Sequence, residues 1–221
     1  PLTLENYCAQ TYSHKELIIV DDGTDPVGDV VAGYPGIGYL SLPRRASIGA
    51  KRNLACEQAR GDIIAHWDDD DWYGPDRLER QVLPIVDGHA DVTGLESGFV
   101  LVLPGGEFWT IDPRLHRRMF VCDVHGGTLV FRKSLWTAGL RYPDINLAED
   151  AALLTAAMTL GARLMRIENS GCFVYVRHGS NAWKFDTGRF LDPRGWQRTA
   201  APPGFELSVQ NRYRFAAGPR A

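Results

Sequence analysis

The residues with the most evident chemistry are four consecutive aspartates, Asp68–Asp71, which lie between Trp67 and Trp72. Adjacent carboxylates repel one another, and a folded protein keeps them together where a cation lies between them. Hard divalent cations take oxygen ligands, and Mg²⁺ is usually held by one or two carboxylates together with the phosphates of a substrate. The sequence therefore predicts a Mn²⁺ or Mg²⁺ site that binds a diphosphate.

Other interpretations of the acidic run fit the sequence less well. A solvated acidic turn does not explain the two flanking tryptophans or the apolar residues "IIA" just before the run. A calcium loop of the EF-hand type fails because, counted from Asp68, Trp72 falls at the fifth position and Gly74 at the seventh instead of the sixth. An aspartate-rich site of the terpene-synthase type needs a mostly helical chain, and this chain alternates strands with helices.

The elements that must position the aspartates follow from the hydrophobic pattern. In the first part of the chain, strands are predicted over 16–20, 37–42 and 62–67, and helices over 4–11, 47–61 and 74–86. Ser47 and Gly61 are the expected caps of the second helix. Strands that alternate with helices predict parallel pairing and an α/β architecture. In open sheets of this kind, ligands bind beyond the carboxyl ends of the strands, where Asp21, Asp22 and the acidic run fall.

The second part of the chain changes character. Residues 97–103 and 106–111 flank "PGG" and predict an antiparallel hairpin. A strand over 126–131 and a short helix from Ser134 follow, then a long helix over 147–161 and two late strands, 163–168 and 172–177. From Asn181 the chain is rich in Pro, Gly and Arg, so we expect 181–221 to be a loosely structured extension of a domain over 1–180.

Composition limits the function classes. The 221 residues carry a net charge of −3, which gives no basic footprint for nucleic acid. No stretch has the apolar length of a transmembrane segment, and no signal peptide is visible, so we expect a cytoplasmic protein. The four cysteines form no CxxC pair and are predicted to be reduced thiols. A zinc site from Cys122, His125, Cys172 and His178 is the alternative, but "CDVH" has no matching second pair.

Four segments in order resemble family 2 glycosyltransferases of the GT-A fold over about residues 4–180. "AQTYSHKELIIVDDGT" and "GAKRNLACEQARGDIIAHWDDDDWYGPDRL" resemble the family's first acidic pair and its DXD metal motif, and "LAED" and "VRHGSN" resemble later family segments. The resemblance implies a Rossmann-like, mostly parallel sheet flanked by helices, with a small antiparallel acceptor-side portion. It also implies an inverting, metal-dependent transfer of a sugar from a nucleotide-sugar donor, expected to be UDP-linked. The acceptor stays open among glycans, lipid-linked sugars, peptides and small molecules.

The resemblance assigns roles to matching positions. Asp150 is the expected catalytic base, with Glu149 as a supporting carboxylate. The expected metal residues are Asp70, Asp71 and His178. The expected donor-binding residues are Asp21, Asp22, Arg52, Asn53, Asp68 and Asp69. Trp67, Trp72 and Trp109 are further candidates for the sugar or acceptor cleft.

Structural roles compete with several of these assignments. Asp21 equally fits a strand-end turn, Arg52 a solvated helix charge, and His178 a structural histidine. Two other functions also stay open, a non-catalytic nucleotide- or glycan-binding domain and a sugar nucleotidyltransferase of related architecture.

One family segment has no counterpart in the sequence. The family begins with an apolar central strand, and this chain starts at the helix that follows it. Either the sequence is a piece of a longer protein, or another segment, such as 205–214, takes that place. We expect an added upstream strand to improve stability and donor affinity, because a central strand has two paired neighbours.

Overall fold

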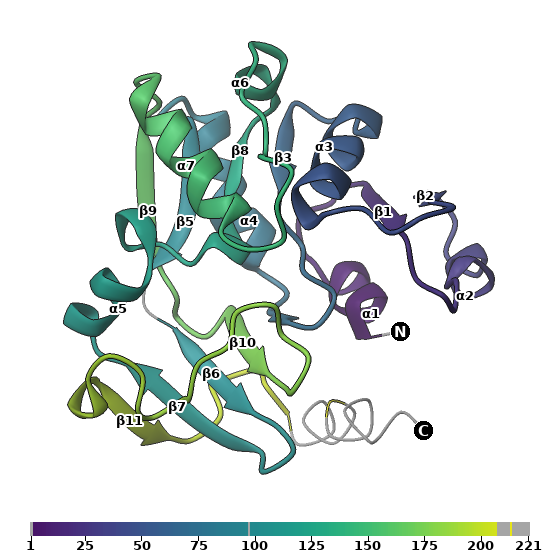
Figure 1. The fold of residues 1–221 in the computed structure, drawn as a ribbon. Helices are drawn as coiled ribbons and strands as arrows, with labels where there is room; N and C mark the ends of the chain where they lie inside the picture. Colours follow the sequence, from purple (N-terminus) through teal and green to yellow (C-terminus); the bar gives the residue numbers. More distant parts are fainter. Residues whose placement is uncertain (1, 97, 207–212, 214–221) are drawn as a thin grey trace.

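The structure, a computed structural model, describes residues 2–96, 98–206 and 213 (Figure 1). Its α-helices are α1 (Leu2–Cys8), α2 (Gly28–Ala32), α3 (Ile48–Gln58), α4 (Arg77–Val86), α5 (Pro113–Met119), α6 (Lys133–Thr137) and α7 (Glu149–Thr159). Three short 3₁₀ turns are η1 (Val121–Asp123), η2 (Gly126–Thr128) and η3 (Pro193–Gly195). The helix over 4–11 is therefore shorter and earlier than predicted, and the other predicted helices are present.

The strands fall into three sheets. They are β1 (Leu17–Asp21), β2 (Ile37–Ser41), β3 (Ile63–Ala65), β4 (Trp72–Tyr73), β5 (Val92–Glu96), β6 (Phe99–Val102), β7 (Glu107–Ile111), β8 (Val130–Arg132), β9 (Leu164–Glu168), β10 (Phe173–Arg177) and β11 (Trp196–Thr199). The sheet orders are β1-β2, β3-β8-β5-β9 and β11-β7-β6-β10-β4. Helices therefore flank sheets in a mixed α/β fold.

The sheet β3-β8-β5-β9 has helices on both faces, and its strand β8 shows why. Neighbouring residues of a strand point to opposite faces. Val130 packs in the cluster that contains Val82 and Ile85 of α4. Phe131 packs in the cluster that contains Leu153 of α7. Figure 1 shows α7 in front of this sheet and α4 behind it.

The expectation of a mostly parallel sheet is only partly met. Parallel pairing joins β1 to β2, β5 to β9 and β6 to β10. The other described pairings are antiparallel, including the predicted hairpin β6-β7 and both edges of β8. Strand β8 follows η2 directly, with no crossover helix to return the chain in the direction of β3, so it runs antiparallel between β3 and β5.

The segment after Asn181 carries more regular structure than predicted. Strand β11 pairs with β7, and Trp196 is buried in the cluster around Val100 and Leu115. Phe205 packs edge to face on Trp72 with ring centroids 5.1 Å apart. These aromatic side chains pack against apolar residues of the sheet β11-β7-β6-β10-β4, which the composition of the segment did not reveal. Most of 205–214 lies outside the described residues, so its suggested role as a substitute strand is not addressed.

Strand β1 has an open edge. Within the described residues β1 pairs with β2 alone, in a sheet separate from β3. Its residues from Ile18 to Val20 are apolar and partly exposed. The edge is of the kind that an added strand would fill, and the expected upstream strand stays a prediction.

Helix α3 begins as predicted and ends early. The side chain of Ser47 caps it by accepting a hydrogen bond from the backbone NH of Ala50. The helix ends at Gln58 with an extended Ala59, so the predicted cap at Gly61 is wrong. The reason is Glu16, whose carboxylate accepts from the backbone NH groups of Arg60 and Gly61 and draws the chain out of the helix.

The cysteines and the helices of the described residues have two further features. All four cysteines are free thiols, with Cys56 and Cys172 buried. No described helix combines the length and the apolar character needed to cross a bilayer.

Candidate active site

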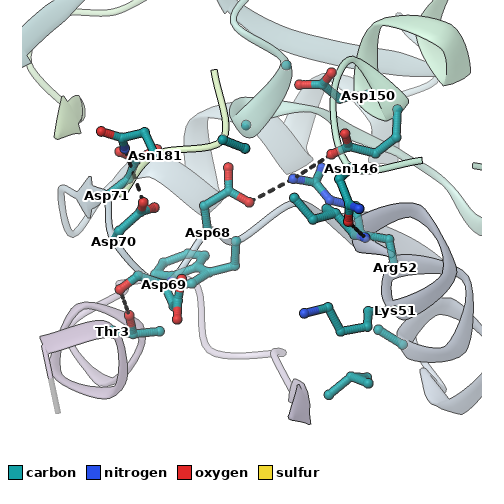
Figure 2. A pocket seen from close by; sticks show the side chains of 18 of the residues that line it. Thr3, Lys51, Arg52, Asp68, Asp69, Asp70, Asp71, Asn146, Asp150 and Asn181 are labelled. Atoms are coloured by element: carbon teal, nitrogen blue, oxygen red, sulfur yellow. Dashed lines mark hydrogen bonds and ion pairs between the residues drawn. The ribbon is translucent and has the colours of Figure 1, made fainter. Parts of the chain in front are cut away.

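A cleft of about 1590 Å³ is lined by β1, by the acidic loop (residues 68–71) that follows β3, and by the starts of α3 and α7. Figure 2 shows carboxylates of the acidic loop on one side and Asp150 on the other, with Arg52 between them. Apolar side chains of β1, Leu17–Val20, line a further part of the wall. The cleft thus joins acidic segments that lie about 80 residues apart in the sequence.

Arg52 links the acidic loop to the start of α7. Its Nη2 lies 2.8 Å from Asp68 Oδ1 and 3.3 Å from Glu149 Oε1. Its Nη1 lies 2.6 Å from Nδ1 of His66, which is buried at the end of β3. The other ring nitrogen of His66 contacts the hydroxyl of Tyr142. His66 therefore holds the guanidinium of Arg52 on one side, and two carboxylates share it on the other. These contacts exclude the alternative in which Arg52 is a freely solvated charge on the helix.

The acidic loop carries more negative charge than its neighbours neutralise. Burial raises the pKa of Asp68 to about 7, Arg52 opposes this rise, and Asp70 and Asp150 add to it. Burial also raises the pKa of Asp71 well above its ordinary value, with Asp70 and Asp68 adding to the shift. Carboxylates whose ionisation is suppressed in this way release protons readily when a cation arrives.

The predicted metal residues separate into two environments. Nε2 of His178 lies 2.8 Å from Oδ2 of Asp70, and both side chains are partly exposed. Asp71 is only 1% exposed, and its Oδ1 accepts a hydrogen bond of 2.8 Å from the backbone NH of Val176. Asp71 thus ties the loop to β10.

The donor set fits a cation that is completed by its substrate. In the part of the chain that the structure describes, no three His, Cys, Asp or Glu side chains are placed to hold an ion together. Asp70 and His178 lie in contact and could offer two ligands, and Mg²⁺ or Mn²⁺ would then have to take its other ligands from phosphate oxygens and water. The same finding gives no support to a zinc site built on the cysteines.

The carboxylates at the start of α7 differ in burial. Glu149 is 4% exposed, and burial raises its pKa, with Arg52 opposing and Asp150 reinforcing the shift. Asp150 lines the cleft, and its Oδ1 accepts a hydrogen bond from the backbone NH of Ala151. The helix is entered through Ala148, which has a left-handed backbone with φ of +61°. A non-glycine residue in this region is strained, and such strain concentrates at functional sites.

Two glycines of η2 lie against the carboxylates on both sides of the cleft. A Cβ placed on Gly126 would lie 1.7 Å from Oδ2 of Asp150. A Cβ placed on Gly127 would lie 2.6 Å from Oδ2 of Asp68. The side-chain-free turn therefore lets the acidic loop and the start of α7 approach one stretch of backbone.

The predicted donor-binding residues are only partly brought together. Asp22 lines the cleft and pairs with Lys51 at 2.8 Å. Asp21 lies outside the cleft lining, and its carboxylate accepts hydrogen bonds within its own strand-end turn from Gly23 and Val27. The side chain of Asn53 bonds to the backbone of Tyr142 on both sides, so it holds a loop. The acidic-loop members differ too, since Asp68 faces Arg52 whereas Asp69 is exposed.

The N-terminus of α3 is already occupied by protein groups. The backbone NH of Ile48 donates to the side chain of Asn146, and that of Gly49 donates to the carbonyl oxygen of Ile145. With Ser47 accepting from Ala50, the first amides of this helix are satisfied. A phosphate near Arg52 would therefore meet its side-chain charge and not the amides of the helix.

The three candidate tryptophans have different places. Trp67 lines the cleft, and its ring lies 4.3 Å from that of Tyr73. Trp72 is a core residue, and Trp109 lies on β7 of the sheet β11-β7-β6-β10-β4. Neither of the latter two lines the cleft.

Several cleft residues were not singled out from sequence. Lys51 was missed, although its place directly before Arg52 was a usable signal. His125 was considered from sequence only as a zinc ligand; it lines the cleft next to the glycine pair, and the "HGG" triplet before an apolar run was the available hint of that place. Nothing in the local pattern indicated that Tyr142 supports His66.

Comparison with known proteins agrees with the family resemblance seen in the sequence. The sequence profile described as glycosyl transferase family 2 matches residues 1–116. The succinoglycan biosynthesis protein ExoO of Rhizobium meliloti is 27% identical over 197 residues, covering 80% of this chain and 57% of its own length. The putative teichuronic acid biosynthesis glycosyltransferase TuaG of Bacillus subtilis is 34% identical over 85 residues, covering 36% of this chain and 34% of its own length.

The fold is also found in solved structures. The S. aureus TarS fragment 1-349 in complex with UDP-GlcNAc matches with a TM-score of 0.64 at 20% identity, over 83% of this chain and 57% of that one. The same fragment in complex with UDP matches with a TM-score of 0.62, over 79% and 55%. The matches thus span little more than half the length of ExoO and of the TarS fragment.

Proposed function

Because this chain belongs to glycosyl transferase family 2, we propose that it transfers a sugar from a UDP-linked donor to an acceptor with inversion at the anomeric carbon. The observation that carries the proposal is Arg52, which lies within 2.8 Å of the acidic loop and 3.3 Å of the start of α7. The leaving diphosphate would lie at the acidic loop and the attacking acceptor at the start of α7, with the sugar between them. The UDP-GlcNAc complex of TarS supports a UDP-linked donor.

The donor side of the site is the acidic loop. Asp70 and His178 would hold Mg²⁺ or Mn²⁺, which supplies positive charge against the leaving diphosphate. Asp71 holds the loop to β10 and so fixes the direction of Asp70. Arg52 and Lys51 add fixed positive charge at the same wall of the cleft.

The acceptor side is the start of α7. Asp150 takes the proton of the acceptor nucleophile as that nucleophile attacks the anomeric carbon from the face opposite the diphosphate. Glu149 is committed to Arg52 and stays out of proton transfer. An in-line displacement of this kind inverts the configuration.

The test measures UDP release and thermal stability of the native chain with a panel of UDP-sugars, with and without Mn²⁺ or Mg²⁺. We expect UDP and Mn²⁺ together to raise the melting temperature more than either alone, because each completes the coordination of the other. We also expect slow, metal-dependent hydrolysis of at least one UDP-sugar. Binding without hydrolysis or transfer would favour a non-catalytic nucleotide-binding domain. Release of pyrophosphate from a nucleoside triphosphate and a sugar phosphate would favour a nucleotidyltransferase.

A further inference from the structure

His125 is a polar side chain in the cleft that none of the roles above uses. Both of its ring nitrogens are buried, and within the described residues neither has a hydrogen-bond partner. A buried polar atom left without a partner costs about 1–3 kcal/mol. Native proteins keep few such groups, and those they keep call for a functional or structural reason.

The imidazole is held in a fixed position. Its ring packs against Phe120, Phe173 and Tyr175, with centroids 4.7, 4.9 and 4.7 Å away. The backbone NH of His125 donates to the carbonyl oxygen of Leu95 in β5. The ring is therefore pre-oriented and loses little conformational freedom when a ligand binds.

The ring of His125 lies next to the backbone turn that the acidic loop and the start of α7 both approach. A Cβ placed on Gly127 would lie 3.4 Å from Nδ1 of His125 and 2.6 Å from Oδ2 of Asp68. The neighbouring Gly126 approaches Asp150 in the same way. The edge of the ring that carries Nδ1 thus lies beside Gly127, on the backbone turn that the acidic loop and the start of α7 both approach.

The chemistry of the ring selects the kind of partner. Burial lowers the pKa of His125 to about 3, so the imidazole is neutral and has one donor and one acceptor nitrogen. A sugar hydroxyl both donates and accepts, whereas a phosphate oxygen only accepts and is better matched by a cation. The stretch between diphosphate and base is where the transferred sugar must lie.

We propose that His125 binds a hydroxyl group of the sugar that is transferred and so contributes to donor-sugar recognition. This assignment rests on the proposed function, because it takes the acidic loop as the diphosphate side and Asp150 as the base. His125 acts on the sugar alone and makes no contribution to binding of the UDP portion.

The test compares His125→Phe and His125→Asn with the native protein. Phenylalanine keeps the aromatic packing and removes both nitrogens, whereas asparagine keeps a donor and an acceptor. The probes are UDP and a panel of UDP-glucose, UDP-galactose and UDP-N-acetylglucosamine, each with Mn²⁺. His116→Asn is the matched control, since His116 is a buried histidine that also packs on Phe120, with ring centroids 4.6 Å apart, and does not line the cleft.

We expect His125→Phe to lower kcat/KM for hydrolysis of the preferred UDP-sugar by about 10- to 100-fold, the usual worth of a polar contact to a substrate hydroxyl. The Kd for UDP with Mn²⁺ should stay within about twofold of native, and His125→Asn should recover part of the lost rate. His116→Asn should hydrolyse the UDP-sugar like the native protein.

Four results would overturn the assignment. A His125→Phe rate within about twofold of native would show that the nitrogens do not bind the sugar. An equal loss of UDP affinity, or an equal loss in His116→Asn, would assign His125 to packing. If the native protein neither binds UDP with Mn²⁺ nor hydrolyses any UDP-sugar, the proposed function fails, and the role of His125 fails with it.

Discussion

At the scale of single residues, the different burial of Glu149 and Asp150 suits them to different roles. Glu149 is nearly inaccessible and paired with Arg52, so it neutralises the guanidinium that also holds Asp68. Asp150 lines the cleft beside the glycine turn. A proton acceptor must reach its substrate, and Asp150 is the more exposed of these two cleft residues and the one that is not paired with Arg52.

We therefore predict that Asp150→Asn cuts transfer by a factor on the order of 10²–10⁴, the usual worth of a positioned base. Asparagine is nearly isosteric but takes no proton, so the affinity for UDP with Mn²⁺ should be unchanged. Glu149→Gln should cost less, because it weakens the contact to Arg52 without removing the base. The measurements are transfer rate and nucleotide affinity for both variants. A transfer rate within a few-fold of native for Asp150→Asn would contradict the assignment.

Asp70 and Asp71 differ in the same manner on the donor side. Asp70 is partly exposed and contacts His178, whereas Asp71 is buried under the backbone NH of Val176. We predict that Asp70→Ala abolishes the combined stabilisation by UDP and Mn²⁺ in thermal unfolding. Asp87→Ala, a change at the exposed end of α4, is the control and should keep it. If Asp70→Ala binds Mn²⁺ with UDP as tightly as the native chain, the metal assignment is wrong.

At the scale of elements, the site depends on the close approach of η2 to the start of α7 and to the acidic loop. The approach needs glycine for space and not for its backbone, because neither Gly126 nor Gly127 has a positive φ. A side chain at Gly126 would occupy the position of the Asp150 carboxylate.

We predict that Gly126→Ala lowers transfer by at least about tenfold, because the base must move, and costs about 1–3 kcal/mol of unfolding free energy as overpacking does. Gly98→Ala is the matched control, since a Cβ there meets no heavy atom within 4 Å. Rates and urea unfolding curves of both variants provide the check. Native-like transfer by Gly126→Ala would mean that Asp150 works from another position.

At the scale of the whole molecule, hydrophobic pattern predicted the elements better than their pairing. The run at 62–67 and the cap at Ser47 are local features, and both are present in the structure. The direction of β8, the pairing of β11 with β7 and the contact of Tyr213 with the carbonyl oxygen of Asp71 join segments that are distant in sequence. No local pattern encodes such contacts. The carboxylates were found because four in a row are unusual, whereas a single histidine such as His125 carries no comparable signal.

The histidines His66, His116 and His125 also make the stability of the whole molecule sensitive to acid. Burial lowers the pKa of each, and that of His125 to about 3. In the unfolded chain a histidine takes up a proton near pH 6.5. The stability that each neutral histidine contributes is therefore fully present above about pH 6.5 and is lost as the pH falls toward the folded pKa.

Replacing His125 with Phe isolates this effect, because the carboxylates with raised pKa, which act in the opposite direction, are present in both proteins. Between pH 7 and pH 4.5, His125 of the native protein gains a proton in the unfolded chain but stays neutral in the folded state. The variant has no titrating group at this position. The unfolding free energy of the variant minus that of the native protein should therefore rise by on the order of 2 kcal/mol over this range. Urea unfolding of the protein without ligands at several pH values measures the difference. His89→Phe, the same change at an exposed histidine, should follow the native pH dependence. A difference between His125→Phe and native that stays constant from pH 7 to pH 4.5 would mean that the His125 ring accepts a proton in the folded state as readily as in the unfolded chain.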